Sequence, residues 1–217
     1  MNIGILGTGN VGETIGSRLI ELGHTVKMGS RTATNEKAAA WVSKAGASAS
    51  AGTFADAASF GEIIFNCTKG IISHEVLQMA GTENINGKVV IDVSNPLDAS
   101  NGGLPVLSIS NTDSLGELLQ RSFPDAHIVK ALNTMWCGIM VNPRMLKGIH
   151  HTYICGNNAE AKQKTAGILQ QFGWAENEII DLGDITNARG TESILPLWLR
   201  VYNATKNGAF NFGIVTA

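Results

Sequence analysis

The first 22 residues contain a short apolar segment, a glycine-rich turn and a helical pattern, in that order. Residues 2–6 are mostly apolar, and Gly7, Gly9 and Gly12 follow them with the spacing G-x-G-x-x-G. Residues 11–22 then repeat apolar positions with the 3.6-residue period of a helix. A buried strand that turns sharply through glycines into a helix is typical of the first unit of a dinucleotide-binding α/β fold.

The rest of the chain continues this alternation of strands and helices. Further strands are predicted for residues 24–28, 62–67, 88–93, 127–132, 152–155 and 178–182. Helices are predicted for residues 35–44, 53–59, 73–79 with Ser73 as N-cap, 114–121, 158–172 and 188–207. Residues 101–113 form a long connection rich in Gly, Ser and Asn. This order predicts an α/β fold, a doubly wound parallel (Rossmann) sheet with helices on both faces.

Length and composition limit the class of protein. The 217 residues are consistent with one domain, on the basis of roughly 100–200 residues per domain. The C-terminal helical segment of the chain, about 186–217, has more apolar residues than one narrow buried face of a helix can hold. We therefore expect it to cap the substrate pocket or to form a dimer interface. No apolar run is long enough to span a membrane. With 16 Lys and Arg against 18 Asp and Glu, and no basic patch, we expect no nucleic-acid partner.

The cysteines and histidines show no metal-binding pattern. Cys67, Cys137 and Cys155 are far apart and have apolar neighbours, which predicts buried free thiols. The adjacent His150 and His151 have no further ligand at metal spacing and are predicted to lie in a loop. The N-terminus lacks the basic start of a signal peptide, so we expect a reduced, cytoplasmic protein.

The glycine-rich turn is predicted to bind the pyrophosphate of a dinucleotide. Gly7 makes the tight turn, Gly9 lets the backbone approach the phosphates, and Gly12 lets the helix pack on the strand. Free N–H groups and the dipole at the helix start attract the phosphates. The predicted contacts of this turn are Gly7, Thr8, Gly9, Asn10, Val11 and Gly12.

The end of the second strand indicates which dinucleotide binds. NAD sites usually place an acidic residue there, which holds the ribose 2′-hydroxyl. This chain has Ser30, Arg31 and Thr32 instead. A guanidinium and two hydroxyls suit a 2′-phosphate, and Lys37 lies close enough in sequence to add charge, although it also fits a solvated surface position. The sequence therefore predicts NADP(H) as the cofactor.

Several motifs together resemble the NADPH:deazaflavin (coenzyme F420) oxidoreductase family. They are Ile3-Gly-Ile-Leu-Gly-Thr-Gly-Asn-Val-Gly12, Gly29-Ser-Arg31, Asp92-Val-Ser-Asn-Pro-Leu97, Val129-Lys-Ala-Leu-Asn-Thr134 and Glu192-Ser-Ile-Leu-Pro-Leu197. The resemblance implies an NADP-dependent oxidoreductase, typically a homodimer. The same domain occurs in membrane ferric reductases, where NADPH lies next to a flavin. The resemblance also implies cofactor contacts after the third predicted strand, at Thr68, Lys69 and Ile71.

Two segments depart from the family pattern and leave the hydride acceptor open. Lys69-Gly70 stands where a proline and an aromatic residue are common, and Met135-Trp136-Cys137 stands where smaller residues are common. These positions are expected to shape the pocket of the second substrate, for which the resemblance implies coenzyme F420 or a flavin. The NADP(H) site is not affected by either departure.

Hydride transfer between a nicotinamide and a flavin-type ring needs alignment more than acid–base help, so no catalytic residue is assigned. Pro96, Asn133 and Trp136 are the candidates for the acceptor pocket. Asn95 and Asn133 are expected to hold the nicotinamide carboxamide or a ring edge. Trp136 suits an apolar wall and equally suits ordinary packing. Lys130 is not assigned to catalysis, because no acidic partner stands beside it in the sequence.

Two alternatives remain open at this point. One is an NADPH-binding redox sensor without catalysis, whose binding residues would look the same. The other is a short enzyme similar to pyrroline-5-carboxylate reductase. Chain length argues against the second, because such enzymes need a large helical domain after the dinucleotide-binding unit.

Overall fold

One sheet of eight strands forms the centre of the molecule. A computed structural model describes residues 1–217. The strands lie in the order β10-β9-β8-β5-β4-β1-β2-β3. Six of these strands, β3-β2-β1-β4-β5-β8, follow the doubly wound order, in which the chain builds the sheet outward from β1 in one direction and then from β4 in the other. The predicted fold class is therefore confirmed. The bounds are β1 (Asn2–Leu6), β2 (Thr25–Ser30), β3 (Ala49–Thr53), β4 (Ile63–Asn66), β5 (Val89–Asp92), β8 (His127–Ala131), β9 (Thr152–Cys155) and β10 (Ile179–Asp181).

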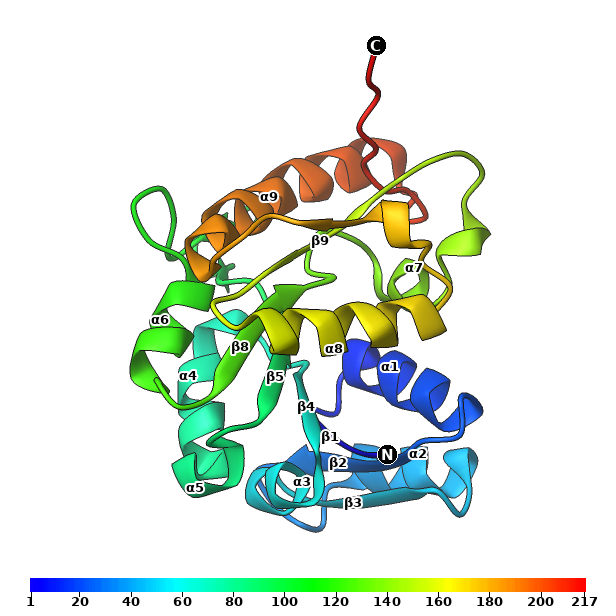
Figure 1. Cartoon of the computed structure of the whole chain (residues 1–217), viewed down its shortest axis with the longest axis vertical. Coiled ribbons are helices and arrows are strands. Elements are labelled where there is room, and N and C mark those ends of the chain that lie inside the picture. The colour runs from blue at the N-terminus through cyan, green and yellow to red at the C-terminus, as the bar shows by residue number, and fades with distance from the viewer.

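Helices cover both faces of this sheet and bury two apolar cores. One core joins the sheet to α1 (Asn10–Glu21), α2 (Glu36–Ala45), α7 (Cys137–Val141) and α8 (Ala159–Gln171). The other joins it to α3 (Phe54–Phe60), α4 (Gly70–Ala80), α5 (Thr82–Ile85), α6 (Leu115–Ser122) and the start of α9 (Ala188–Thr205). Figure 1 shows α4, α5 and α6 together on one side of the sheet and α1 and α8 on the other. Short 3-10 turns span Pro143–Met145, Glu176–Glu178 and Ile185–Asn187.

Side-chain caps explain where several helices begin. Asn35, Ser114 and Asn158 each accept a hydrogen bond from the third backbone N–H beyond them, and Thr53 forms a reciprocal capping box with Asp56. Each cap of this kind stabilises a helix start by about 1 kcal/mol. The N-terminus of α1 differs, because Gly9 offers no side chain to cap it.

The strands and helices differ from the prediction in four places. It is not wholly parallel, because β9 pairs antiparallel with β8. Strand β3 was not predicted, since small and polar residues give it little apolar pattern, and it is the outermost strand next to β2. The predicted N-cap at Ser73 is wrong: α4 begins at Gly70, and Ser73 is buried inside the helix. A small antiparallel pair joins β6 (Leu97–Asp98), which precedes the long connection, to β7 (Val106–Leu107) within it.

The C-terminal segment is helical over only part of the predicted range. Helix α9 ends at Thr205, where Lys206 adopts a left-handed conformation with φ of 55°, so the helical prediction for 206–217 is wrong. The tail returns to the loop before β9, where the N–H of His151 donates to the carbonyl of Phe212 at 3.1 Å. Figure 1 shows α9 and the tail at the edge of the molecule. Neither α9 nor any other helix combines the length and hydropathy needed to cross a membrane.

Candidate functional site

The carboxyl ends of β1, β2 and β4 surround a hollow of about 580 Å³. It lies where the strand order reverses, the usual place for a ligand in an open α/β sheet. Eight predicted cofactor contacts line it: Gly7, Thr8, Gly9, Ser30, Arg31, Thr32, Thr68 and Lys69. Four lining residues were not predicted: Asn35, Phe54, Cys67 and Ile72.

The three glycines of the turn have different surroundings. Gly7 has φ of +117°, which disfavours any side chain, and a Cβ there would lie 2.9 Å from the carbonyl oxygen of Cys67. A Cβ on Gly12 would lie 2.3 Å from the carbonyl oxygen of Gly7, so α1 packs directly on the turn. A Cβ on Gly9 would meet nothing within 4 Å. The space above Gly9 is therefore open and available to a phosphate group.

The first turn of α1 faces this space without a protein acceptor. Asn10, Val11 and Gly12 form that turn rather than the wall of the hollow, and no side chain caps their N–H groups. The early amides of a helix and its dipole favour an anion. Together with the open space above Gly9, this geometry fits the pyrophosphate of a dinucleotide.

The hollow carries positive charge at the ends of β2 and β4. Arg31 and Lys69 line it, no carboxylate does, and neither cation takes part in an ion pair. Ser30 is buried, and its hydroxyl donates to the carbonyl of Thr32 at 2.5 Å. Ser30 thus shapes the loop, while Arg31 remains exposed and free to meet a 2′-phosphate.

Three other predicted cofactor contacts lie outside this hollow. Lys37 is exposed in the first turn of α2, and Ile71 is exposed on α4. Asn95 lies in the loop after β5 and contacts the next strand end instead. The side chain of Lys37 has no hydrogen-bond or ion-pair partner that would fix it toward the hollow.

A second group of polar residues joins the ends of β5 and β8. Asn95 donates to the carbonyl of Asn133 at 2.7 Å, and the Asn133 amide donates to Oδ1 of Asn95 at 3.0 Å. Leu132 has φ of 62°, a strained conformation for a residue with a side chain. Asn133 is only 2% exposed, yet its Oδ1 has no partner, and neither has the hydroxyl of buried Thr134. Strain and unpaired buried acceptors are typical of a binding site.

The acceptor candidates lie along this same edge. Pro96 is buried, and its carbonyl accepts from the N–H of Ser108 at 2.8 Å. Trp136 is 41% exposed, and its ring covers Gly138, where an added Cβ would lie 2.5 Å from it. Neither these two nor Asn133 line the cofactor hollow. The structure thus separates the predicted contacts into two neighbouring groups.

A buried polar network connects the two groups. Thr68 donates to Oδ1 of Asn66 at 2.6 Å, and the Asn66 amide donates to Ser73 and to Asp92, both at 2.9 Å. Ser94 donates to the same Asp92 oxygen at 2.6 Å. The sequence prediction missed Asn66 and Asp92. The available signal was a polar residue ending each of the apolar strands β4 and β5.

Lys130 is part of the same buried region, and the expectation that it lacks an acidic partner is wrong. Its ammonium lies 2.6 Å from Asp92 and 2.8 Å from Glu192, and all three side chains are buried. Burial alone would lower the pKa of Lys130, but the two carboxylates outweigh it and raise that pKa to about 12. Both partners are distant in sequence, so only tertiary structure brings them together.

Thiol chemistry is not supported in the hollow. Cys67 lines it, but burial raises the pKa of its thiol well above the ordinary value, so the thiol stays protonated. All three cysteines are buried and free, as predicted.

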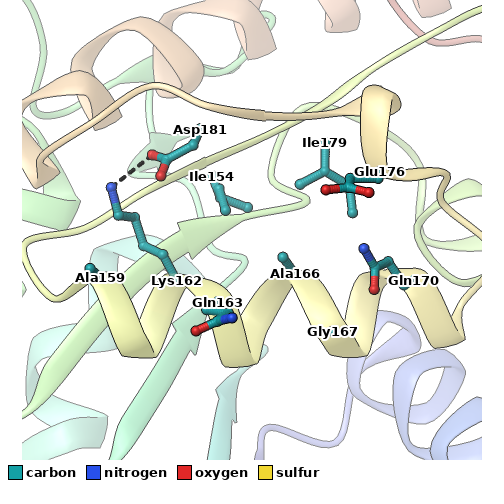
Figure 2. Close-up of a pocket in the computed structure, with 10 residues that line it drawn as sticks. All are labelled: Ile154, Ala159, Lys162, Gln163, Ala166, Gly167, Gln170, Glu176, Ile179 and Asp181. Atoms are coloured by element: carbon teal, nitrogen blue, oxygen red, sulfur yellow. Dashed lines mark hydrogen bonds and ion pairs between the residues drawn. The ribbon is translucent and has the colours of Figure 1, made fainter.

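A further hollow of about 530 Å³ lies between α8 and the strands β9 and β10, as Figure 2 shows. Lys162 crosses one end and pairs with Asp181 at 2.8 Å. Gln163, Gln170 and Glu176 add further polar groups, while Ile154, Ala166 and Ile179 form its apolar part. None of the predicted site residues lies there.

Comparison with known proteins agrees with this geometry. The family model described as NADP oxidoreductase coenzyme F420-dependent matches residues 2–96. A crystal structure from Arthrobacter sp. FB24, described as a candidate F420-dependent NADP reductase, is 42% identical, covers 99% of both chains and superposes with a TM-score of 0.92. The chain belongs to this family. It is therefore related to NADP-dependent oxidoreductases over its whole length.

Two more distant relatives define the limits of this relationship. Metalloreductase STEAP3 from Rattus norvegicus is 30% identical over 203 residues, which are 90% of this chain but 37% of the relative. The chain thus spans about a third of the metalloreductases that it matches. A reductive aminase from Aspergillus terreus shares only 19% identity with a TM-score of 0.65, and the match covers 94% of this chain and 62% of that one. The last comparison shows the fold alone.

Proposed function

We propose that this protein transfers a hydride between NADPH and a flat flavin-type acceptor, such as coenzyme F420, a free flavin or, through a flavin, ferric iron. The hollow at the β1–β4 switch carries the proposal, because it combines an open glycine turn with two unpaired cations and no carboxylate. NADPH supplies the hydride when bound, and Gly9, Arg31 and Lys69 would hold its phosphates.

The acceptor would bind beside the cofactor, at the ends of β5 and β8. There Asn133 keeps an unpaired oxygen and Trp136 exposes part of its ring. A flat ring binds such a surface through area and shape more than through charge. Two of the relatives, an F420-dependent NADP reductase and a metalloreductase, fit acceptors of this kind.

The two alternatives predict different outcomes. A redox sensor would bind NADPH at the same hollow and transfer no hydride. An enzyme similar to pyrroline-5-carboxylate reductase would reduce the imine bond of pyrroline-5-carboxylate.

A panel of acceptors tests the proposal. Purified protein and NADPH are mixed with coenzyme F420, FMN, riboflavin, a ferric chelate or pyrroline-5-carboxylate, and NADPH oxidation is followed by absorbance. We expect turnover with a flavin-type acceptor. Turnover only with pyrroline-5-carboxylate would replace the proposal with the imine-reductase alternative. Tight NADPH binding without any turnover would favour the sensor.

The Asn133→Ala variant then tests the acceptor edge. Because Asn133 lies outside the cofactor hollow, we expect kcat to fall while the Kd for NADPH stays nearly unchanged. An equal loss of NADPH affinity would place Asn133 in the cofactor site instead.

A further inference from the structure

The ammonium group of Lys130 is fully buried and fully hydrogen-bonded. An ammonium has three N–H donors. They face Oδ2 of Asp92 at 2.6 Å, Oε1 of Glu192 at 2.8 Å and the backbone carbonyl of Ser94 at 2.9 Å. One side chain therefore joins β8, the end of β5, the loop after β5 and helix α9.

The two carboxylates of this cluster are also satisfied elsewhere. Glu192 accepts the N–H groups of Leu115 and Gly116, at 2.9 and 3.0 Å, in the first turn of α6. The positive end of that helix offsets the second negative charge. Asp92 accepts from Asn66 and from Ser94 through its other oxygen. No polar atom of Lys130, Asp92 or Glu192 is left unpaired.

Stability alone is a weak reason to bury three charges. Apolar residues of similar volume are often equally or more stabilising, because desolvation of the charges is costly. The location of the cluster suggests another role. The Ser94 carbonyl that Lys130 holds directly precedes Asn95, and Asn95 forms the reciprocal pair with Asn133. The strained Leu132 stands two residues after Lys130 on the same segment.

We propose that Lys130 is a positioning residue for the acceptor side of the reaction. By holding the Ser94 carbonyl, it keeps Asn95 and Asn133 in register, and through Glu192 it fixes α9 to the same edge. It acts through other residues and does not touch the reacting atoms. The inference rests on the proposed hydride transfer. A misplacement of about 1 Å at such an edge costs on the order of a hundredfold in rate.

The test replaces the cluster without leaving a charge unpaired. The triple variant Lys130→Met, Asp92→Asn, Glu192→Gln is neutral and keeps an oxygen at two of the three positions. The matched control is Lys162→Met with Asp181→Asn, which removes the partly exposed ion pair seen in Figure 2, a pair that shares no hydrogen bond with the cluster. For both variants we measure folding by circular dichroism, the Kd for NADPH, kcat with the best acceptor, and hydrogen exchange of residues 94–97 and 132–134.

We expect the triple variant to fold, to bind NADPH within about twofold of wild type, and to lose about tenfold to a hundredfold in kcat. Exchange should become faster at residues 94–97 and 132–134, while the control keeps both kcat and exchange. An unchanged kcat in the folded triple variant would overturn the inference, as would an equal loss of NADPH affinity. If wild type turns over no acceptor, the proposed function fails on its own. In that case hydrogen exchange tests the positioning role, and unchanged exchange rates at residues 94–97 and 132–134 of the triple variant would reject it.

Discussion

Replacing Arg31 tests whether the end of β2 selects NADP(H) over NAD(H). Arg31 is exposed at the rim of the cofactor hollow and forms no ion pair, so nothing in the protein competes for its guanidinium. No carboxylate lines the hollow to hold a ribose 2′-hydroxyl. In Arg31→Ala, only the ligand that carries a 2′-phosphate should lose a contact.

The size of the effect follows from the type of contact. A hydrogen bond to a charged group contributes about 1.5–3 kcal/mol, which is roughly tenfold to a hundredfold in affinity. Because Arg31 is exposed, we expect the lower part of that range and a decrease with added salt. Lys69 lines the same hollow and should retain part of the preference in the variant.

Titration of intrinsic fluorescence with NADPH and NADH measures this effect. Wild type should prefer NADPH, Arg31→Ala should weaken NADPH alone, and the control Arg200→Ala on α9 should change neither affinity. Equal affinities of wild type for the two cofactors would refute the specificity argument. An equal loss of NADPH and NADH affinity in Arg31→Ala would also refute it, because the residue would then contact a group common to both.

Three further predictions concern the turn, the buried charges and the C-terminal helix. Gly9→Val should fold normally, because a Cβ at this position meets no other atom, but it should lose NADPH binding. The control Gly190→Val, whose Cβ also lies in open space, should bind NADPH normally. Normal NADPH affinity in Gly9→Val would contradict the role of Gly9 at the phosphates. The pKa of Lys130 is about 12 in the folded protein, against ~10.4 for an unfolded lysine. Its ion pairs therefore stabilise the fold fully below pH ~10.4, and this stabilisation is lost as the pH rises through the folded pKa. The Tm should therefore fall more between pH 10 and 12 in wild type than in the triple variant Lys130→Met, Asp92→Asn, Glu192→Gln, which leaves no buried charge unpaired. Burial raises the pKa of the Cys155 thiol to about 12 as well, but this thiol is present in both proteins, and parallel curves would contradict the prediction. We propose a homodimer that uses α9, where the side chain of Leu197 is 54% exposed. Leu197→Asp should then shift the sedimenting species from dimer to monomer. A wild type that sediments as a monomer at all concentrations would reject the proposal.

The local sequence predicts the backbone geometry of the glycine turn and the position of Arg31 at the end of β2. The motif from Gly7 to Gly12 and the run from Ser30 to Thr32 are each short, and their geometry depends on neighbouring residues. Gly7 has the positive φ that the tight turn requires, and Arg31 follows directly after β2. Most strands and helices were also predicted to within a few residues, because their apolar periodicity is strong.

Elements with weak or ambiguous patterns were missed or misplaced. β3 has small and polar residues, and the antiparallel direction of β9 has no local signal, since direction depends on which strand it pairs with. The C-terminal helical segment was predicted to reach about residue 217, whereas α9 ends at Thr205. The actual path of the tail depends on a hydrogen bond from His151, more than fifty residues earlier in the chain.

The sequence by itself determined the fold class and the glycine turn, because both depend on residues close together along the chain. Asn95, Pro96, Asn133 and Trp136 were named as candidates from the sequence, but only the tertiary structure shows how the loops after β5 and β8 are held together. Asn95 and Asn133 lie 38 residues apart in sequence, as do Asp92 and Lys130, and Glu192 belongs to the last helix. A buried ammonium requires carboxylates within hydrogen-bond distance. Only the folding of the sheet and α9 brings them there.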